Sequence, residues 1–479
     1  MKKAILFMLM LSILSLAACA DTNDNEAVKN TEAQIISDEP AEPEKSYYDD
    51  LGERDFEGGK FTILDANYNP DIWANTPEGI IGEPVNDALI ARNSFIEEKY
   101  NVNIEYVQIA GYNTGTQSLK NSVAAGENLY DMVISTVLGG NFDTLSQNNV
   151  LYNLAEVPHL SLTSPWWSKH IYDNMTFKGK LFYTAGDIVP SMYQAPAAIY
   201  VNKRLLSDYA VQENLYDLVF EGKWTIDILE KIIKDMDQDL NSDGNLHIDD
   251  DFFGLVTEDN SLTSNAFATA MGIKLATVQS DTITIDFTSV GVAEKIDRLA
   301  GILKKVNVSN YDNVRKVIFQ SGRSLFLMHY LESALLLMRG MDDDYGILPM
   351  PKYNEQQESY VSFLNAWNSC FIAVPLHADV EKAGFVMEAM AYASYEMVRP
   401  NIYELALKTK FTRDSESARA IDIIIESSYI DLNGIYNFGG SADIVRNAIF
   451  EKQPLISAYE AKENAVKTAI DKFIAAISE

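Results

Sequence analysis

Cysteine and histidine are rare in this chain, and their rarity excludes several kinds of protein. Only two cysteines, Cys19 and Cys370, and five histidines occur among 479 residues. Cys370 lies in an apolar run, where a buried thiol is expected, so a disulfide framework is excluded. A nucleophile elbow, a P-loop and a dinucleotide-binding glycine pattern are missing as well. The five histidines are His159, His170, His247, His329 and His377. Their spacing matches no metal-binding motif.

Positive charge is also scarce. The chain has 38 Lys and Arg residues against 69 Asp and Glu residues, which gives a net charge of −31. Nucleic acids and anionic lipid surfaces repel a protein of this charge, so neither is an expected partner. Neutral solutes and cations remain as ligands.

Long apolar runs are confined to the N-terminus. Two lysines precede an apolar run at residues 4–14, which ends at Leu16-Ala17-Ala18-Cys19. The run is too short to span a membrane, and its basic start predicts a signal peptide over residues 1–18. Its end resembles the lipobox of bacterial lipoproteins. The resemblance implies that Cys19 carries acyl chains such as palmitate, which anchor the protein at the extracellular face of the cytoplasmic membrane. An ordinary secreted protein with an incidental cysteine is the alternative.

The stretch after Cys19 is too polar to form a core. Residues 20–45 carry eight carboxylates against Lys29 and Lys45, and they contain no aromatic residue. Too little apolar area is available there to offset the chain entropy. We therefore expect residues 19–55 to form a disordered, extended acidic tether.

The remainder has the patterns of a large α/β protein. Hydrophobic residues make up 47% of the chain and aromatic residues 11%, and its length exceeds what one core usually organises, so two lobes are expected. A strand, a helix, a strand, a helix and a strand are predicted in turn, which indicates a mostly parallel sheet. These elements are predicted at residues 60–64, 85–100, 103–107, 117–125 and 130–135. Later strands are predicted at 180–184, 198–201, 325–328 and 345–349, and helices at 224–236, 380–394, 415–428 and 458–477.

Several short motifs, taken in order, resemble a known family. They are Lys178-Gly179-Lys180-Leu181-Phe182-Tyr183, Ile199-Tyr200-Val201-Asn202-Lys203, Lys223-Trp224-Thr225, Phe319 to Phe326 and Tyr345 to Pro351. Together they are similar to the sugar-binding type-1 class of extracellular solute-binding proteins of ABC importers, over roughly residues 56–479. Two details depart from that family. Leu325-Phe326 stands where Ala-Met is usual, and the Tyr-Asn-Lys motif contains one inserted residue, Val201.

The resemblance implies a two-lobed, type II periplasmic-binding-protein-like fold with the ligand in a cleft between the lobes. Each lobe would contain a mostly parallel sheet flanked by helices. Residues 56–198 and 362–412 would form the N-terminal lobe, and residues 199–361 and 413–479 the C-terminal lobe. The protein would be a monomer that delivers its solute to ABC permease subunits, and ATP hydrolysis would occur in separate subunits because this chain has no nucleotide-binding motif.

Loops that follow the predicted strands carry the expected ligand site, because ligands of open α/β sheets lie beyond the carboxyl ends of parallel strands. Aromatic rings pack on the apolar faces of pyranose rings, and amides bond to hydroxyl groups. A carbohydrate is therefore the expected ligand. The length of the chain and its aromatic residues favour an oligosaccharide, and peptides, polyols and nucleoside-like solutes are the alternatives. Trp367, which lies between Asn365 and Asn368, is the foremost candidate, although an aromatic residue taken alone is more often part of the core. The expected site residues are Tyr68, Asn69, Trp73, Thr136, Tyr193, Gln194, His329, Tyr330, Asn365 and Trp367.

Residues 239–250 have the spacing of a twelve-residue calcium loop, with Gly244 at the sixth position. The usual glutamate at the twelfth position is replaced by Asp250 or, with one residue of slack, by Asp251. We expect a structural Ca²⁺ and no organic cofactor; a solvated acidic turn is the alternative. The expected ligands are Asp239, Asn241, Asp243, Asn245 and Asp250.

Two other classes of protein compete with this interpretation. A surface glycoside hydrolase needs a pair of carboxylates across the scissile bond, and 69 acidic residues leave many pairs open. No motif singles out such a pair, so we expect a binding protein without catalytic residues. A ligand sensor could use the same fold and cleft, and the sequence does not separate it from a transport protein.

Overall fold

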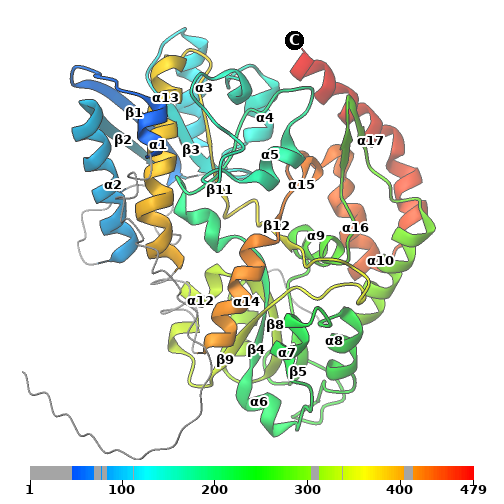
Figure 1. Cartoon of the computed structure of the whole chain (residues 1–479). Coiled ribbons are helices and arrows are strands. Elements are labelled where there is room, and N and C mark those ends of the chain that lie inside the picture. Colours follow the sequence, from blue (N-terminus) through cyan, green and yellow to red (C-terminus); the bar gives the residue numbers. More distant parts are fainter. Residues whose placement is uncertain are drawn as a thin grey trace, which may run out of the picture. The chain divides into compact units, whose positions relative to one another are not determined.

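Two four-stranded sheets form the frame of the computed structural model (Figure 1). The structure describes residues 46–68, 77, 83–111, 113–303, 312–336, 338–403 and 414–478. The predicted signal peptide, Cys19 and the acidic tether up to residue 45 lie outside the described residues. The chain divides into residues 1–46 and 47–479, and the account below concerns the second unit. Among the described helices, none combines the length and the apolar character needed to cross a membrane.

The first sheet has the strand order β11-β3-β1-β2. β1 (Gly59–Tyr68) pairs in parallel with β2 (Val102–Ala110) and with β3 (Met132–Thr136), whereas β11 (Cys370–Ala373) is antiparallel to β3. Helices α2 (Pro84–Tyr100) and α3 (Thr114–Ala124) connect the three parallel strands. All five predicted elements of this segment are therefore confirmed. Every residue of β3 is buried, as expected for a central strand covered on both faces.

The second sheet has the order β5-β8-β4-β9. β5 (Phe253–Val256), β8 (Ser324–Tyr330) and β9 (Tyr345–Pro349) run in one direction, and β4 (Ala197–Asn202) runs against both of its neighbours. The expectation of a mostly parallel sheet is wrong here, because two of the three pairings are antiparallel. β4 enters directly from the segment that leaves the first sheet, without a helical crossover, so its direction is reversed. β11 is the corresponding reversed strand of the first sheet.

Helices surround these sheets. Those not yet introduced are α1 (Tyr47–Leu51), α4 (Phe142–Gln147), α5 (Lys169–Met175), α6 (Lys203–Asp208), α7 (Leu215–Phe220), α8 (Ile226–Ile233), α9 (Ser261–Ala270), α10 (Val290–Ile302), α11 (Asp312–Gln320), α12 (Glu332–Leu336), α13 (Val380–Ala393), α14 (Ser415–Glu426), α15 (Leu432–Tyr436), α16 (Ser441–Phe450) and α17 (Leu455–Ser478). Short strands β6 (Thr277–Gln279) and β7 (Thr282–Thr284) form a hairpin.

Two predicted elements differ from the structure. The helix predicted at 224–236 is only α8, because Trp224 is buried ahead of it and donates its indole N–H to the carbonyl of Pro349 at 2.8 Å. The strand predicted at 180–184 forms only isolated bridges, one to Phe177 and one to Ile372. The turn at Lys178 and Gly179, both with positive φ, folds this segment back on itself before a ladder can form.

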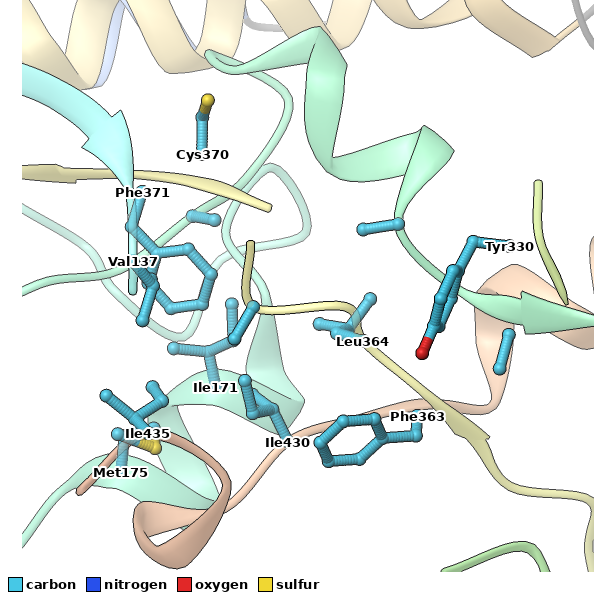
Figure 2. Packing of buried hydrophobic residues seen from close by; sticks show 14 of the residues in the cluster. Val137, Ile171, Met175, Tyr330, Phe363, Leu364, Cys370, Phe371, Ile430 and Ile435 are labelled. Atoms are coloured by element: carbon cyan, nitrogen blue, oxygen red, sulfur yellow. The ribbon is translucent and has the colours of Figure 1, made fainter. Parts of the chain in front are cut away.

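The segments that connect the two sheets pack together. β10 (Ser362–Phe363) pairs in parallel with β12 (Ser428–Tyr429), and Leu364 donates its backbone N–H to Tyr429 at 2.8 Å. Figure 2 shows the apolar side chains around them, where Phe363 and Leu364 lie near Ile430. The structure thus places the connections close to one another, while the predicted lobe boundaries at 198, 361 and 412 stay predictions.

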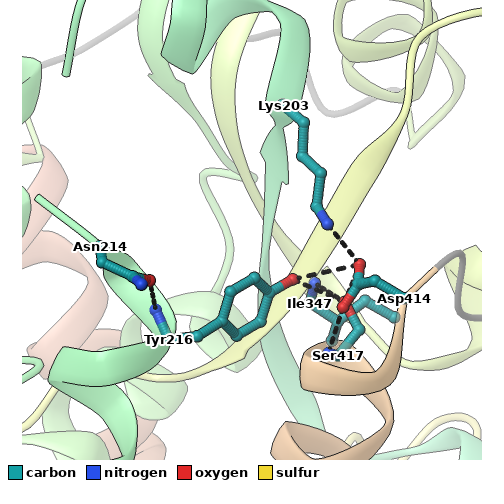
Figure 3. A network of polar contacts seen from close by, with 6 residues as sticks. All are labelled: Lys203, Asn214, Tyr216, Ile347, Asp414 and Ser417. Atoms are coloured by element: carbon teal, nitrogen blue, oxygen red, sulfur yellow. Dashed lines mark hydrogen bonds and ion pairs between the residues drawn. The ribbon is translucent and has the colours of Figure 1, made fainter. Parts of the chain in front are cut away.

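α14 is fixed to the second sheet by a polar network (Figure 3). Asp414 caps the helix by accepting from the backbone N–H of Ser417 at 2.5 Å, and its other oxygen accepts from Lys203 at 2.6 Å. The hydroxyl of Ser417 in turn accepts from the backbone N–H of Ile347, in β9, at 3.1 Å. This network places the chain after residue 413 against the second sheet.

The N-terminal helix α1 is held by a buried carboxylate on α13. The hydroxyl of Tyr47 donates to Glu388 at 2.8 Å, and the indole N–H groups of Trp166 and Trp167 donate to the same carboxylate at 3.0 and 2.9 Å. The backbone N–H of Ser161 is the fourth donor, at 3.1 Å. Burial raises the pKa of Glu388. The expected tether is therefore too long at its C-terminal end, since residues 47–51 form a helix that packs on aromatic rings of the body.

Candidate ligand-binding site

A cavity of about 650 Å³, here called the first cavity, lies where β5 and β8 end. It is closed by the loop that precedes β11 and by one face of α16. Ligands of α/β sheets gather at the carboxyl ends of parallel strands, and β5 and β8 are parallel neighbours. The lining residues are Glu258, Asp259, Asn260, Ser261, Leu262, His329, Tyr330, Glu332, Asn365, Trp367, Asn368, Asp443 and Arg446.

Trp367 is the exposed aromatic residue of this cavity. Its side chain is 45% exposed, whereas Trp166, Trp167 and Trp224 are buried. Its backbone is held in place, because its N–H donates to the side-chain oxygen of Asn365 at 3.0 Å. An indole ring left in water on a fixed loop offers a flat apolar face to a ligand.

His329, another residue of the cavity wall, is oriented by two neighbours. Its Nδ1 lies 2.5 Å from the hydroxyl of Ser333, four residues onward in α12, and its Nε2 lies 3.7 Å from a carboxylate oxygen of Glu258. The other oxygen of Glu258 accepts from the side-chain amide of Asn260 at 2.6 Å. His329 is largely buried, and it lines the cavity beside Glu258.

Glu332 connects two separate parts of the cavity wall. It lies at the start of α12 and accepts a hydrogen bond from the side-chain amide of Asn368, which belongs to the loop before β11. Burial raises the pKa of Glu332. The contact joins a helix between two strands of the second sheet to a loop that leads into the first sheet, so it connects two walls of the cavity.

The cavity has an acidic balance. Arg446 pairs with Asp259 at 2.6 Å, which neutralises that carboxylate, and Asp443 accepts from the hydroxyl of Ser261 at 3.0 Å. Glu258 and Glu332 add two more carboxylates. Such a lining accepts hydroxyl and amino groups and disfavours anions.

The structure brings four of the expected site residues to this cavity, namely His329, Tyr330, Asn365 and Trp367. Three others do not line it, because Thr136, Tyr193 and Gln194 are buried elsewhere. Asn69 and Trp73 lie outside the described residues, as does the side chain of Tyr68. That any of the ten contacts a ligand stays a prediction.

Several cavity residues were missed by sequence reasoning. Glu258, Asp259 and Asn260 follow β5, a strand too short to stand out from its surroundings in the sequence. Asp443 and Arg446 lie three residues apart on α16, which was not predicted. Their spacing marks one helical face, but only the fold shows that this face meets the ends of β5 and β8.

Tyr193 is buried, and its hydroxyl group bonds to a buried carboxylate. Its hydroxyl donates to Asp187, and Arg399 lies 3.7 Å from the second oxygen of that group. Burial raises the pKa of Asp187 to about 6, against the Tyr193 and Arg399 contacts that lower it. The side chain is buried and does not line the first cavity.

The raised pKa of Asp187 predicts a pH-dependent stability. The pKa of the Asp187 carboxyl is 3.8 in the unfolded chain and about 6 in the folded protein. Between these two pH values the folded state binds more protons than the unfolded state, so the free energy of unfolding falls as the pH rises from about 4 through 6. Asp187→Asn keeps an acceptor for Tyr193 and cannot ionise. We expect its stability relative to wild type to rise by about 2 to 3 kcal/mol from pH 4 to pH 8, measured by denaturant unfolding. A difference that does not change with pH would show that Asp187 titrates normally.

The calcium-like loop is exposed and organised around Asp239. Its carboxylate accepts from the backbone N–H groups of Ser242 at 2.7 Å and of Gly244, the sixth position, at 2.7 Å. Asp250 accepts from the side-chain amide of Asn241 at 2.6 Å. In the part of the chain that the structure describes, no three His, Cys, Asp or Glu side chains converge as a metal site.

Asp251 has a different role from Asp250. It is buried and accepts from the backbone N–H groups of His247 at 2.6 Å and Leu240 at 2.8 Å. These backbone hydrogen bonds, that of His247 foremost, lower the pKa of Asp251. Asp251 therefore closes the loop, and Asp250 is the carboxylate that remains for a cation at the twelfth position.

Two sheets joined by reversed crossing strands, with a polar and aromatic cavity at the strand ends, define a solute-binding protein. The family model described as bacterial extracellular solute-binding protein matches residues 91–397. The chain belongs to this family, as the motifs predicted. A search of the curated protein sequences finds no match.

Solved structures support the same architecture. A cyclo/maltodextrin-binding protein complexed with maltotetraose is similar with a TM-score of 0.58 and 13% identity, over 86% of this chain and 97% of that one. The maltose/maltodextrin-binding domain from Bdellovibrio bacteriovorus, bound to maltotriose, gives 0.52 and 12%, over 86% and 100%. An ABC substrate-binding protein from Listeria monocytogenes, in complex with cycloalternan, gives 0.50 and 13%, over 86% and 98%. The predicted two-lobed binding-protein fold is confirmed.

Proposed function

We propose that this protein captures a carbohydrate, specifically an oligosaccharide, in the first cavity and delivers it to the permease of an ABC importer. The observation that carries the proposal is Trp367, an exposed indole in a cavity whose other walls include several amides and carboxylates. The ring would stack on a pyranose face while Asn368, Glu258 and Asp443 bond to hydroxyl groups. The oligosaccharides in the three similar structures support this ligand class.

Binding would work by lobe closure. Glu332 and Asn368 come from elements that serve different sheets, and a ligand that touches both stabilises the arrangement in which they are close. Hinge closure of this kind needs segments that bend between the lobes, and β10 and β12 lie among such connections. The permease would then recognise the closed form.

We propose further that Cys19 carries the lipid anchor and that the protein acts at the extracellular face of the membrane. The family is extracellular, and the basic, apolar and small-residue pattern before Cys19 supports lipidation. Replacing Cys19 by serine should move the protein from the membrane fraction to the medium; a variant that stays in the membrane fraction would contradict the anchor. Binding without catalysis is proposed as well, since the family and the similar structures are binding proteins.

A ligand screen tests the proposal. The chain from residue 20 onward, which keeps α1, is screened by thermal shift against mono- and oligosaccharides, with peptides in parallel. A ligand that binds only the folded state stabilises it by about 2.7 kcal/mol at a hundredfold excess over its Kd. We expect a shift with one saccharide series and no turnover of it. Shifts with peptides alone would overturn the carbohydrate assignment, and released products would favour a hydrolase.

We also propose that the loop at 239–250 binds a structural Ca²⁺ through Asp239, Asn241, Asp243, the carbonyl of Asn245 and Asp250. The hydrogen bonds of Asp239 support this proposal. Its carboxylate, at the first position of the loop, accepts from two backbone N–H groups and so holds the loop curved around it. The loop contributes nothing to the first cavity, so its role would be stability.

Chelation should therefore lower the melting temperature without abolishing saccharide binding. Calcium at a hundredfold over its Kd would add about 2.7 kcal/mol of stability, which the chelator removes. Asp239→Ala should melt at the same temperature with and without calcium, whereas Asp249→Ala, a neighbouring exposed carboxylate that is not an expected ligand, should respond like wild type. A wild-type melting curve that calcium does not change would remove this proposal.

A further inference from the structure

A second cavity, of about 690 Å³, lies beside β5 and α10, and the proposed function does not use it. Its wall includes apolar side chains such as Leu255 and Phe450 and a polar group centred on Arg298. Arg298 bonds to Glu230 at 2.9 Å and also to Asp227. The wall further carries Lys231, Lys234, Asp235, Asp237 and Asp259, so it holds five carboxylates against three cations. Charged donors and acceptors beside an apolar floor suit a hydroxyl-rich ligand, because each hydroxyl group can both donate and accept.

One extended segment separates the two cavities. Leu255, Thr257 and Asp259 line the second cavity, whereas Glu258 and Asn260 line the first. Successive side chains of an extended chain point to opposite sides, and Asn260 still has extended backbone angles. The segment that continues β5 is therefore a shared wall, and Asp259 belongs to both cavities.

The same helix also runs along both cavities. Asp443 and Arg446 line the first cavity, and Phe450 lines the second. These positions are separated by three and four residues, so they lie on one face of α16. Two different elements thus border both spaces, so the two cavities are adjacent along these elements.

A polar contact lies at the junction of the cavities. Arg446 pairs with Asp259 at 2.6 Å, and Glu451, just beyond the end of α16, lies 3.7 Å from the same guanidinium. All three side chains are partly exposed. Arg446 also donates to the side-chain oxygen of Asn447 at 2.9 Å. A ligand that spans both cavities therefore passes over this partly exposed pair and can bond to its charged groups.

We infer that the two cavities are the two ends of one binding groove, and that an oligosaccharide long enough to pass the Asp259–Arg446 pair places its further sugar units in the second cavity. This inference rests on the proposed function, since it extends the same ligand. It assigns a length preference to the protein. Short saccharides fill the first cavity alone, and longer ones gain affinity from the second.

Gly301 offers a way to block the second cavity alone. It lies on α10 and lines that cavity, and a Cβ built there meets no atom within 4 Å. Gly301→Trp therefore fits into open space, and replacing glycine within a helix also favours the helix. Gly291→Trp is the matched control, because Gly291 lies on the same helix, has the same free space and does not line the cavity.

The experiment measures the Kd of the chain from residue 20 onward by calorimetry, with malto-, cello- and xylo-oligosaccharides from the disaccharide to the longest soluble member of each series. In wild type and Gly291→Trp, we expect the longest members of the binding series to bind about tenfold more tightly than the tetrasaccharide. Gly301→Trp should bind the short members with unchanged Kd and show no gain with length.

Each other result is informative. An equal gain with length in all three proteins would show that the longer chain leaves the first cavity by another route, and it would overturn the inference. If the affinity of wild type does not increase with saccharide length, the ligand does not extend beyond the first cavity. That result would also overturn the inference, while the proposed function would stand. Failure of every saccharide to bind any of the proteins would remove the proposed function, and the groove with it.

Discussion

Replacing Trp367 by alanine should weaken saccharide binding about a hundredfold, because a central aromatic residue that a ligand covers contributes about 2 to 4 kcal/mol. The indole is the exposed aromatic surface of the first cavity, and its position is fixed by Asn365. Removing it takes away the flat face on which a pyranose ring stacks. Calorimetry with the saccharide found in the ligand screen measures the loss.

The stability of the protein should be nearly unchanged by this substitution, because 45% of the side chain is already in water. The melting temperature of the unliganded variant checks that point. Trp367→Phe keeps a smaller ring and should lose only about tenfold in affinity. Leu129→Ala removes an exposed apolar side chain that does not line the cavity, so it should bind like wild type. Unimpaired binding by Trp367→Ala would place the ligand elsewhere.

Replacing Glu388 by alanine should lower the free energy of unfolding by about 3 to 5 kcal/mol, because four donors lose their acceptor and each buried unsatisfied donor costs about 1 to 3 kcal/mol where water does not reach it. Four donors converge on this carboxylate, and three of them are the side chains of Tyr47, Trp166 and Trp167. Without an acceptor, each donor stays buried and unsatisfied. Denaturant unfolding measures the loss, and proteolysis near α1 reports whether the N-terminal helix is released.

Glu388→Gln separates the hydrogen bonds from the packing. Glutamine has one acceptor oxygen and an NH₂ group, so two of the four donors would face another donor, and we expect a loss of about 2 kcal/mol. Glu381→Ala is the control, because Glu381 lies two turns away on α13 and makes only exposed contacts with Arg54 and His159. Such a surface pair contributes less than about 1 kcal/mol. A Glu388→Gln protein as stable as wild type would show that the carboxyl group is already protonated.

The local patterns of the sequence determined the class of the protein and the central strands of both sheets. The alternation of apolar strands and helices from 60 to 135 gave the three parallel strands of the first sheet correctly, whereas its fourth strand, β11, was not predicted. The order of short motifs gave the family, which the match over residues 91–397 confirms. Trp367 also stood out locally, as a large ring between two asparagines in a loop.

The tertiary structure alone decided what those elements meet. Apolar content does not state strand direction, so the reversal of β4 in the second sheet was not predictable. Tyr193 and Trp367 look alike as loop aromatics, yet Tyr193 is buried on Asp187 and Trp367 faces the cavity. Asp259 and Arg446 are nearly two hundred residues apart in the sequence, and only the packing of α16 beside β5 makes them a pair. Burial is a local property of a pattern, whereas a binding site depends on long-range contacts that no single segment encodes.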